Sequence, residues 1–356
     1  MKHPIALTVA ALALPALIAA ALPADKVEFH PADGLSLTRT YSQKTELSLD
    51  DMEMSLNGQP SPMQIEMEMD MTMNQHVVVS DEISSVSDGR PAKLVRSFDE
   101  LSQQSDFKVE MAQMPQGNQE RSVKAESELQ GKKVTFTWDA DSSSYKTAFE
   151  GEGDAALLEG LEEDMDLTVL LPTTEVKEGD SWQIDVKRLR TLLAYGGNLK
   201  LKPTEGAEGA DGMPGMDNMT DFSSVFGELL EGDAKGEYRG TREVDGTQCQ
   251  VIHVKLDVNA SADISDKVQE AMKDLPNEQI QSMKIERMDL EMELDGEGDL
   301  YWDPAKGVAH SFELTGTTNL NMDMGMAVSM GEQPMNIEQS FKLSGSFANS
   351  IAIRPN

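Results

Sequence analysis

Apolar and polar side chains alternate with a period of two over long stretches of this chain. The clearest stretch has an apolar residue at every second position and polar residues between them: Met63, Ile65, Met67, Met69, Met71 and Met73. Successive side chains of a β-strand point to opposite faces of the sheet, so this pattern is typical of a strand with one buried face. The alternation recurs over residues 288–294 and 320–330. It predicts long half-buried strands near both ends of the chain.

The phase of this alternation slips by one residue at two places. The apolar residues of 47–49 lie in one phase and those of 52–56 in the other, and a second slip separates Ile285 from Met288. A β-bulge inserts one residue into a strand and returns the apolar side chains to the same face of the sheet. We therefore expect bulges at Asp50–Asp51 and just after Ile285.

Segments with helical spacing of apolar residues are short and few. They cover residues 154–165, 186–195, 220–230 and 265–275. The dipeptides Asn57-Gly58 and Asp245-Gly246 favour tight hairpins between antiparallel strands. The sequence predicts a mainly β fold: large antiparallel, strongly twisted sheets in a half-barrel or sandwich-like arrangement, with a few short helices.

The first 24 residues have the layout of a cleavable secretory signal peptide. Lys2 precedes an apolar run over residues 5–22, which ends in small residues. No cysteine follows the run to carry a lipid, and the single cysteine, Cys249, excludes an internal disulfide. We expect a periplasmic or secreted protein. Its predicted parts are a signal peptide at 1–24, a β-rich segment at 25–202, a flexible Gly-, Met- and acid-rich loop at 203–220, and a second β-rich segment at 221–356.

Composition changes the expected character of the core. The 356 residues include 63 acidic and 30 basic side chains, for a formal net charge of -33, and only 39% are hydrophobic. Phosphate binding needs clustered Lys and Arg, so this charge argues against a nucleic-acid partner. The chain also contains 23 methionines. A core can form only if methionine supplies much of it.

The inward-facing methionines are the main candidate for a binding site. Thioether side chains are flexible and apolar, so a concave sheet that they line can adapt to an acyl chain or another hydrophobic ligand. The residues assigned to this face are Met63, Met67, Met69, Met71, Met73, Met322, Met324 and Met326. The alternative is that they fill an ordinary closed core. The expected partners are a hydrophobic ligand or an envelope protein, with no nucleic acid and no transmembrane segment after signal cleavage.

The second candidate is a copper site in the loop at 203–220. Met213, Met216 and Met219 follow one another at intervals of three, and thioethers select Cu(I). This segment resembles the Met-rich segments of periplasmic copper-resistance proteins, although it lacks their interleaved histidines. The resemblance implies copper handling as an alternative function, with copper as the cofactor. If the segment is a plain flexible loop, no cofactor is expected.

The sequence offers little for catalysis. It contains no G-x-S-x-G, H-E-x-x-H, P-loop or dinucleotide-binding motif. Cys249 and His253 share one face of a predicted strand over 248–262, but no third orienting group accompanies them. We predict a non-enzymatic protein without catalytic residues.

Short structural motifs give a resemblance that covers most of the mature chain. Leu171-Pro172 precedes Gly179-Asp180-Ser181-Trp182, and a Met-alternating region follows late in the chain. In this the chain resembles a group of uncharacterised exported β-rich bacterial proteins, which implies no activity. The expected architecture has a more distant likeness to periplasmic lipoprotein carriers of the LolA/LolB type, whose antiparallel half-barrels wrap an apolar cavity.

Overall fold

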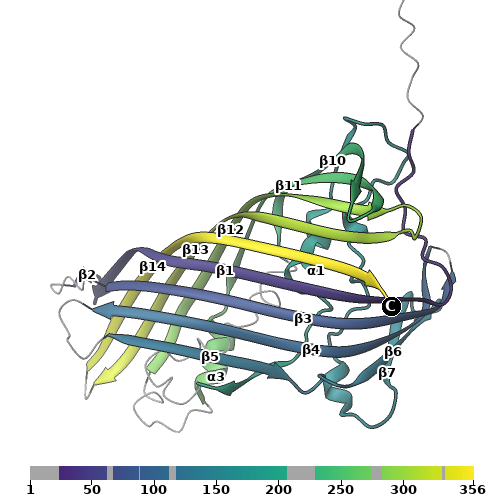
Figure 1. The fold of residues 1–356 in the computed structure, drawn as a ribbon. Helices are drawn as coiled ribbons and strands as arrows, with labels where there is room; N and C mark the ends of the chain where they lie inside the picture. Colours follow the sequence, from purple (N-terminus) through teal and green to yellow (C-terminus); the bar gives the residue numbers. More distant parts are fainter. Residues whose placement is uncertain are drawn as a thin grey trace, which may run out of the picture.

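A computed structural model describes residues 24–61, 67–87, 89–111, 118–206, 229–273, 283–330 and 333–356. The described strands form a single curled antiparallel sheet of 14 strands (Figure 1). The main path across it runs β7-β6-β4-β3-β1-β14-β13-β12-β11-β10-β8, and no pairing between the described residues of β7 and β8 closes it. The prediction of a mainly β fold with large antiparallel sheets is confirmed.

Six long strands form the middle of the sheet. They are β1 (Leu35–Leu56), β3 (Met67–Ser87), β4 (Arg90–Met111), β12 (Met283–Asp303), β13 (Val308–Met330) and β14 (Gln333–Pro355). The shorter strands are β2 (Gln59–Pro60), β5 (Gln119–Ser127), β6 (Lys133–Asp139), β7 (Ser144–Phe149), β8 (Ser181–Gln183), β9 (Leu201–Glu205), β10 (Glu231–Val244) and β11 (Thr247–Asp263). Because β1 pairs with β14, the first and last long strands are neighbours at the centre of the sheet.

The two phase slips read from the sequence are β-bulges in the structure. The register between β1 and β14 shifts between Leu49 and Asp51, and the register between β12 and β13 shifts between Ile285 and Arg287. Each bulge keeps the apolar side chains beyond it on the inner face. The Asn57-Gly58 hairpin is also confirmed: both residues have positive φ (53° and 73°), as a tight two-residue turn requires.

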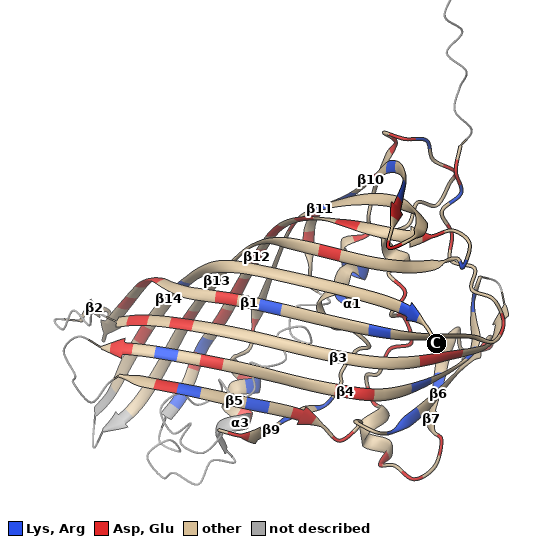
Figure 2. Cartoon of the chain, viewed as in Figure 1, with Lys and Arg blue, Asp and Glu red and all other residues tan. Residues whose placement is uncertain are grey.

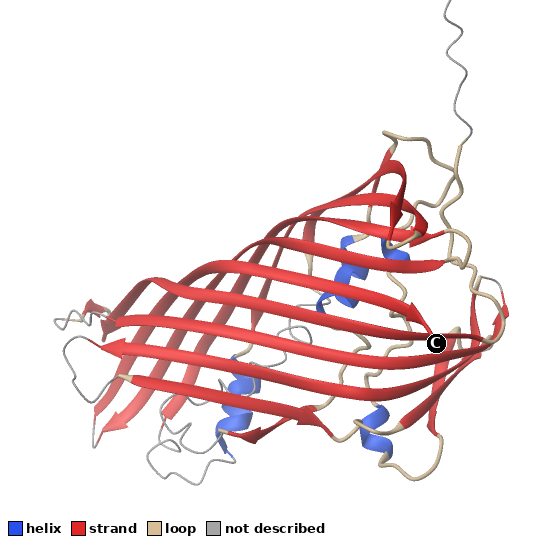
Figure 3. Ribbon diagram, viewed as in Figure 1, coloured by secondary structure: helices blue, strands red, loops and turns tan. Residues whose placement is uncertain are grey.

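The helices are short and lie on the concave side of the curled sheet (Figure 3). They are the 3₁₀ turns η1 (Ala155–Leu158), η2 (Thr168–Leu170) and η3 (Val186–Leu189), and the α-helices α1 (Arg190–Leu193) and α3 (Ser265–Lys273). The last three confirm the helices predicted at 186–195 and 265–275. The helix predicted over 220–230 falls almost entirely outside the described residues.

The helix predicted over 154–165 was wrong, because only the single turn η1 forms there. Gly160 adopts a left-handed conformation with a φ of 78°, which ends the turn. The backbone carbonyls of Glu162 and Glu163 then accept hydrogen bonds from the Arg96 guanidinium at 3.0 Å each. In a helix the Glu162 N–H would donate to the carbonyl of Leu158, but here it donates to the carbonyl of Gly196 at 2.8 Å, so the helical hydrogen bonds do not continue.

Charged residues of both signs are spaced along the long strands (Figure 2). In β3, for example, Glu68 and Asp70 are exposed, whereas Met69 and Met71 on the other face are buried. No helix among the described residues is long and apolar enough to span a membrane.

Candidate functional site

An apolar cavity of about 100 Å³ lies on the inner face of the sheet. Its apolar lining includes Leu47, Met71, Met73, Leu193, Met292 and Phe347. Three strands separate β3, which carries Met71 and Met73, from β12, which carries Met292. Both strands reach the same cavity because the sheet curls around it. Leu193 of α1 contributes to the wall from outside the sheet.

Two facing glycines make room for the aromatic ring in this cavity. Gly296, Gly316 and Phe347 occupy one register row across β12, β13 and β14, and the row continues to Thr45 of β1. A Cβ atom on Gly316 would lie 2.8 Å from Phe347 Cε1, and one on Gly296 would lie 2.8 Å from Phe347 Cζ. The ring therefore occupies the space that side chains would fill at these positions.

Only some of the methionines predicted to form the binding face line the cavity. Met71 and Met73 line it, whereas the buried Met69 and Met322 pack in the hydrophobic core. The other predicted members within the described residues, Met67, Met324 and Met326, are half-buried. Met63 lies outside the described part of the chain. The assignment of these methionines to a ligand remains a prediction.

The polar residues that line the cavity are not among the site residues predicted from the sequence. Gln43, Thr45, Thr318 and Asn349 all line it, and each lies in the inward phase of its strand. The signal that could have found them is the alternation itself. Extended backwards from Leu47, the inward phase of β1 passes through Thr45 and Gln43, where apolar residues are expected.

A buried network of ion pairs bounds the inner face beyond the cavity. Arg39 and Asp166 form an ion pair at 2.5 Å, and Arg39 Nε lies 3.3 Å from Asp81 Oδ2. Tyr41 Oη and Arg39 Nη1 both donate to the carbonyl oxygen of Met165 at 2.9 Å. Through these contacts, the segment that follows η1 packs against β1 and β3.

Two carboxyl groups in this region have strongly perturbed proton affinity. Burial raises the pKa of Glu163 to about 8 and that of Asp166 to about 6; neighbouring acids reinforce both shifts, and Arg39 opposes them. Glu163 Oε1 is buried without a hydrogen-bond partner. Burial alone would also raise the pKa of Asp81, but Arg96 and Arg39 together hold it below its ordinary value.

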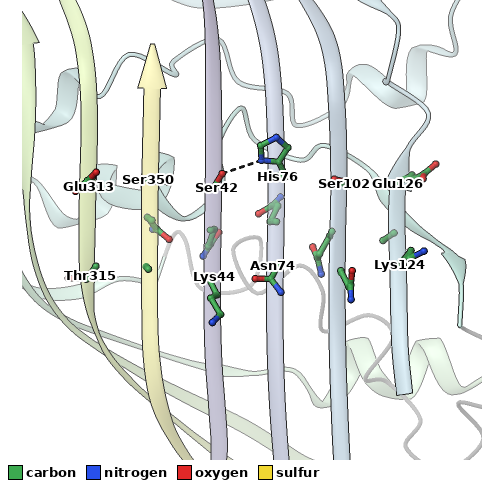
Figure 4. Close-up of a pocket in the computed structure, with 17 residues that line it drawn as sticks. Ser42, Lys44, Asn74, His76, Ser102, Lys124, Glu126, Glu313, Thr315 and Ser350 are labelled. Atoms are coloured by element: carbon green, nitrogen blue, oxygen red, sulfur yellow. Dashed lines mark hydrogen bonds between the residues drawn. The ribbon is translucent and has the colours of Figure 1, made fainter. Parts of the chain in front are cut away.

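A larger and more open groove of about 630 Å³ lies on the outer face (Figure 4). One register row across β13, β14, β1, β3, β4 and β5 supplies its polar lining: Glu313, Ser350, Ser42, His76, Ser102 and Glu126. Lys44 and Lys124 belong to the next outward row along the strands. The outward rows present hydroxyl, amide and charged side chains to the groove.

Ser42 and His76 in this groove do not form a nucleophilic site. Ser42 Oγ lies 3.2 Å from His76 Nδ1, but His76 Nε2 is 3.9 Å from Glu100, which is too far for a hydrogen bond. Ser42 also lies in the middle of a strand paired on both sides, where ladder pairing uses backbone N–H groups that an oxyanion hole would need.

The other chemical candidates also lack an assembled site. Cys249 and His253 are both buried, but four residues of extended strand separate them by about 13 Å. His253 Nδ1 instead lies 2.8 Å from Asp299 Oδ1. In the described ranges, no group of His, Cys, Asp or Glu is arranged to hold a metal ion. Met213, Met216 and Met219 lie outside those ranges, so copper binding remains a prediction.

Comparison with known proteins gives only remote structural likeness. No known protein family matches the chain, and no curated protein is similar to it in sequence. An outer membrane channel from Pseudomonas putida F1 is 8% identical, with a TM-score of 0.21, over 90% of this chain and 97% of that one. The outer membrane protein OprG from Pseudomonas aeruginosa is 8% identical, with a TM-score of 0.20, over 92% of this chain and 99% of that one.

These comparisons correct one expectation about membranes. The sequence predicts a mature chain without a transmembrane segment, whereas both of these neighbours are outer membrane proteins. That prediction was wrong, and it is not carried further.

Proposed function

We propose that this chain is an exported, non-enzymatic binding protein that holds a hydrophobic ligand against the methionine-lined inner face of its sheet. The observation that carries the proposal is the cavity to which Met71 and Met73 come from β3 and Met292 from β12. Methionine has three rotatable side-chain bonds and a polarizable sulfur, so its side chains can move to fit ligands of different shape.

The size of the cavity sets what it can hold. An apolar cavity of roughly 150 Å³ accommodates benzene, so about 100 Å³ holds only part of a larger ligand. The apolar surface continues along the strands, however. Met324 and Met54 face inward in one register row further along, and both are half-buried. The face is therefore open enough for a ligand to extend from the cavity along it.

The length of this face suits an alkyl chain. Nine residues of β1 separate Thr45, in the cavity wall, from Met54, which corresponds to about 30 Å of extended strand. That is about the thickness of a bilayer hydrocarbon core, which two acyl chains span end to end. One extended acyl chain fits within this length.

A fluorescence titration with N-phenyl-1-naphthylamine, an uncharged apolar probe, tests the proposal. Met73→Lys places a charge in the cavity wall, while Asn74→Lys places the same charge on the opposite, exposed face of the same strand. Circular dichroism would establish that both variants are folded. We expect the wild type and Asn74→Lys to bind the probe alike and Met73→Lys to bind at least tenfold more weakly.

Two results would overturn the proposed function. One is the absence of probe binding to the wild-type protein after removal of co-purified lipid. The other is equal affinity in both lysine variants, which would place the bound probe away from the inner face.

A further inference from the structure

A row of amide side chains crosses the inner face beside the cavity. Asn349 of β14, Gln43 of β1, Gln75 of β3 and Gln103 of β4 are successive partners in the strand register. All four lie in the inward phase, and Asn349 and Gln103 are only 2% and 4% exposed. Asn349 and Gln43 also line the cavity, so the row forms its polar end.

The amide of Asn349 is incompletely hydrogen-bonded although it is almost fully buried. Within the described residues its Oδ1 atom accepts no hydrogen bond. Its Nδ2 atom donates to the carbonyl oxygen of Leu192 at a long distance of 3.4 Å. A buried polar atom without a partner costs about 1–3 kcal/mol. A ligand group that donates a hydrogen bond to Oδ1 would remove this cost.

The polar end of the cavity contains no charged side chain. It consists of two amides, Gln43 and Asn349, and the hydroxyl of Thr45, whereas the hydroxyl of Thr318 lies in the register row of Met71. The nearest inward charge along β1 is Arg39, four residues and about 13 Å from Gln43, and it is already paired with Asp166. An ionised head group would lose its hydration here without gaining a counter-charge, which is strongly unfavourable.

From this geometry we infer a head-group subsite formed by Asn349, Gln43 and Thr45. It would accept an uncharged head group that donates a hydrogen bond, such as a hydroxyl or an amide, on a single alkyl chain. The chain would lie against Met71, Met73 and Met292. This inference rests on the proposed function and adds the chemical class of the ligand to it.

A competition series that varies only the head group tests the inference. Decanol, methyl decanoate, decanoate and decane are each used to displace N-phenyl-1-naphthylamine from the full-length mature protein. We expect decanol to compete at least tenfold better than methyl decanoate, which accepts but cannot donate, and better than the anionic decanoate. Decane should also compete more weakly than decanol, because it leaves Asn349 Oδ1 without a partner.

The variant Asn349→Leu tests whether Asn349 is responsible for the preference for decanol. It replaces the amide by an apolar side chain of similar size and removes both the unpaired Oδ1 atom and the long hydrogen bond to the Leu192 carbonyl, so the change in stability should be small. The preference for decanol over decane should fall to within about twofold. The matched control Asn74→Leu, on the exposed face of β3, should leave the preference unchanged.

The outcomes separate this inference from the proposed function. If all four compounds displace the probe equally well, the head-group subsite is refuted while hydrophobic binding stands. If decanoate competes best, the subsite recognises an anion and the inference is also refuted. If the wild type does not bind the probe at all, both proposals fail. If Asn349→Leu does not fold, the competition series on the wild-type protein still tests the head-group subsite, because it requires no substitution.

Discussion

Arg96 of β4 and Asp81 of β3 form a bidentate salt bridge in the interior of the protein. The Nε–Oδ1 and Nη2–Oδ2 distances are 2.8 and 2.9 Å, and both residues are 1% exposed. The two residues are partners in the strand register, so the sheet itself positions the pair. Arg96 also binds the segment that follows η1 through the carbonyls of Glu162 and Glu163. One arginine thereby joins the sheet to the segment packed on its inner face.

Removing the charge of Asp81 should strongly destabilise the fold. Asp81→Asn leaves two buried guanidinium groups, Arg96 and Arg39, without their shared carboxylate, and breaking a buried pair typically costs about 3–5 kcal/mol. Urea unfolding of the protein measures this loss. Asp70→Asn makes the same chemical change on the exposed face of the same strand and should change the free energy of unfolding by no more than about 0.5 kcal/mol. Similar values for the two variants would contradict the ion-pair network.

Stability should decrease between about pH 5 and pH 8. Burial raises the pKa of Glu163 to about 8, so the folded state holds a proton that the unfolded chain releases near its ordinary value of 4.5. Between these values the folded state binds more protons, and the free energy of unfolding falls by up to about 1.4 kcal/mol per pH unit for one such group. Asp166, raised to about 6, contributes in the same direction over the lower part of this range.

The variant Glu163→Gln isolates this effect. It mimics the protonated side chain, so urea unfolding at several pH values should show a flatter pH dependence than in the wild type. Glu159→Gln, at an exposed site in the same segment, should keep the wild-type slope. An unchanged slope in Glu163→Gln would show that the side chain is ionised in the folded state.

The two facing glycines should not tolerate side chains. In Gly316→Ala the new Cβ would lie 2.0 Å from the carbonyl oxygen of Asp295 and 2.8 Å from the Phe347 ring. Overpacking of this kind costs about 1–3 kcal/mol and would disturb the cavity wall. Gly325→Ala on the same strand is the matched control, since its nearest contact is an ordinary 3.6 Å. Thermal unfolding should show a lowered midpoint for the first variant only.

Oxidation rates should show which of the inward-facing methionines are fully covered. Buried Met69 and Met322 should react with hydrogen peroxide more slowly than half-buried Met67 and Met324, which lie two residues away on the same strands. Peptide mass spectrometry of the folded protein measures the sulfoxide formed at each position. The four residues should react equally in urea-unfolded protein. Equal rates in the folded protein would contradict the burial of Met69 and Met322.

The strands of this protein could be predicted because the alternation that indicates a strand lies within the strand's own residues. Alternation places Met69 and Met71 on one face and Asp70 on the other whatever the strand pairs with. The bulge after Leu49 could also be predicted, because a single extra residue reverses the phase of the apolar–polar alternation. The helix predicted over 154–165 failed because Gly160 is left-handed and the Glu162 N–H donates to the carbonyl of Gly196, which is distant in sequence, and not to that of Leu158.

By itself the sequence determined that long strands turn their methionines to one side, since the two-residue period of a strand is a property of the backbone. Which strands became neighbours was decided only by the tertiary structure. The pairing of β1 with β14 and the curl of the sheet bring Met73, Met292 and Asn349 to one cavity from distant parts of the chain. Curvature and long-range register depend on the packing of the whole sheet, and no local pattern of residues encodes them.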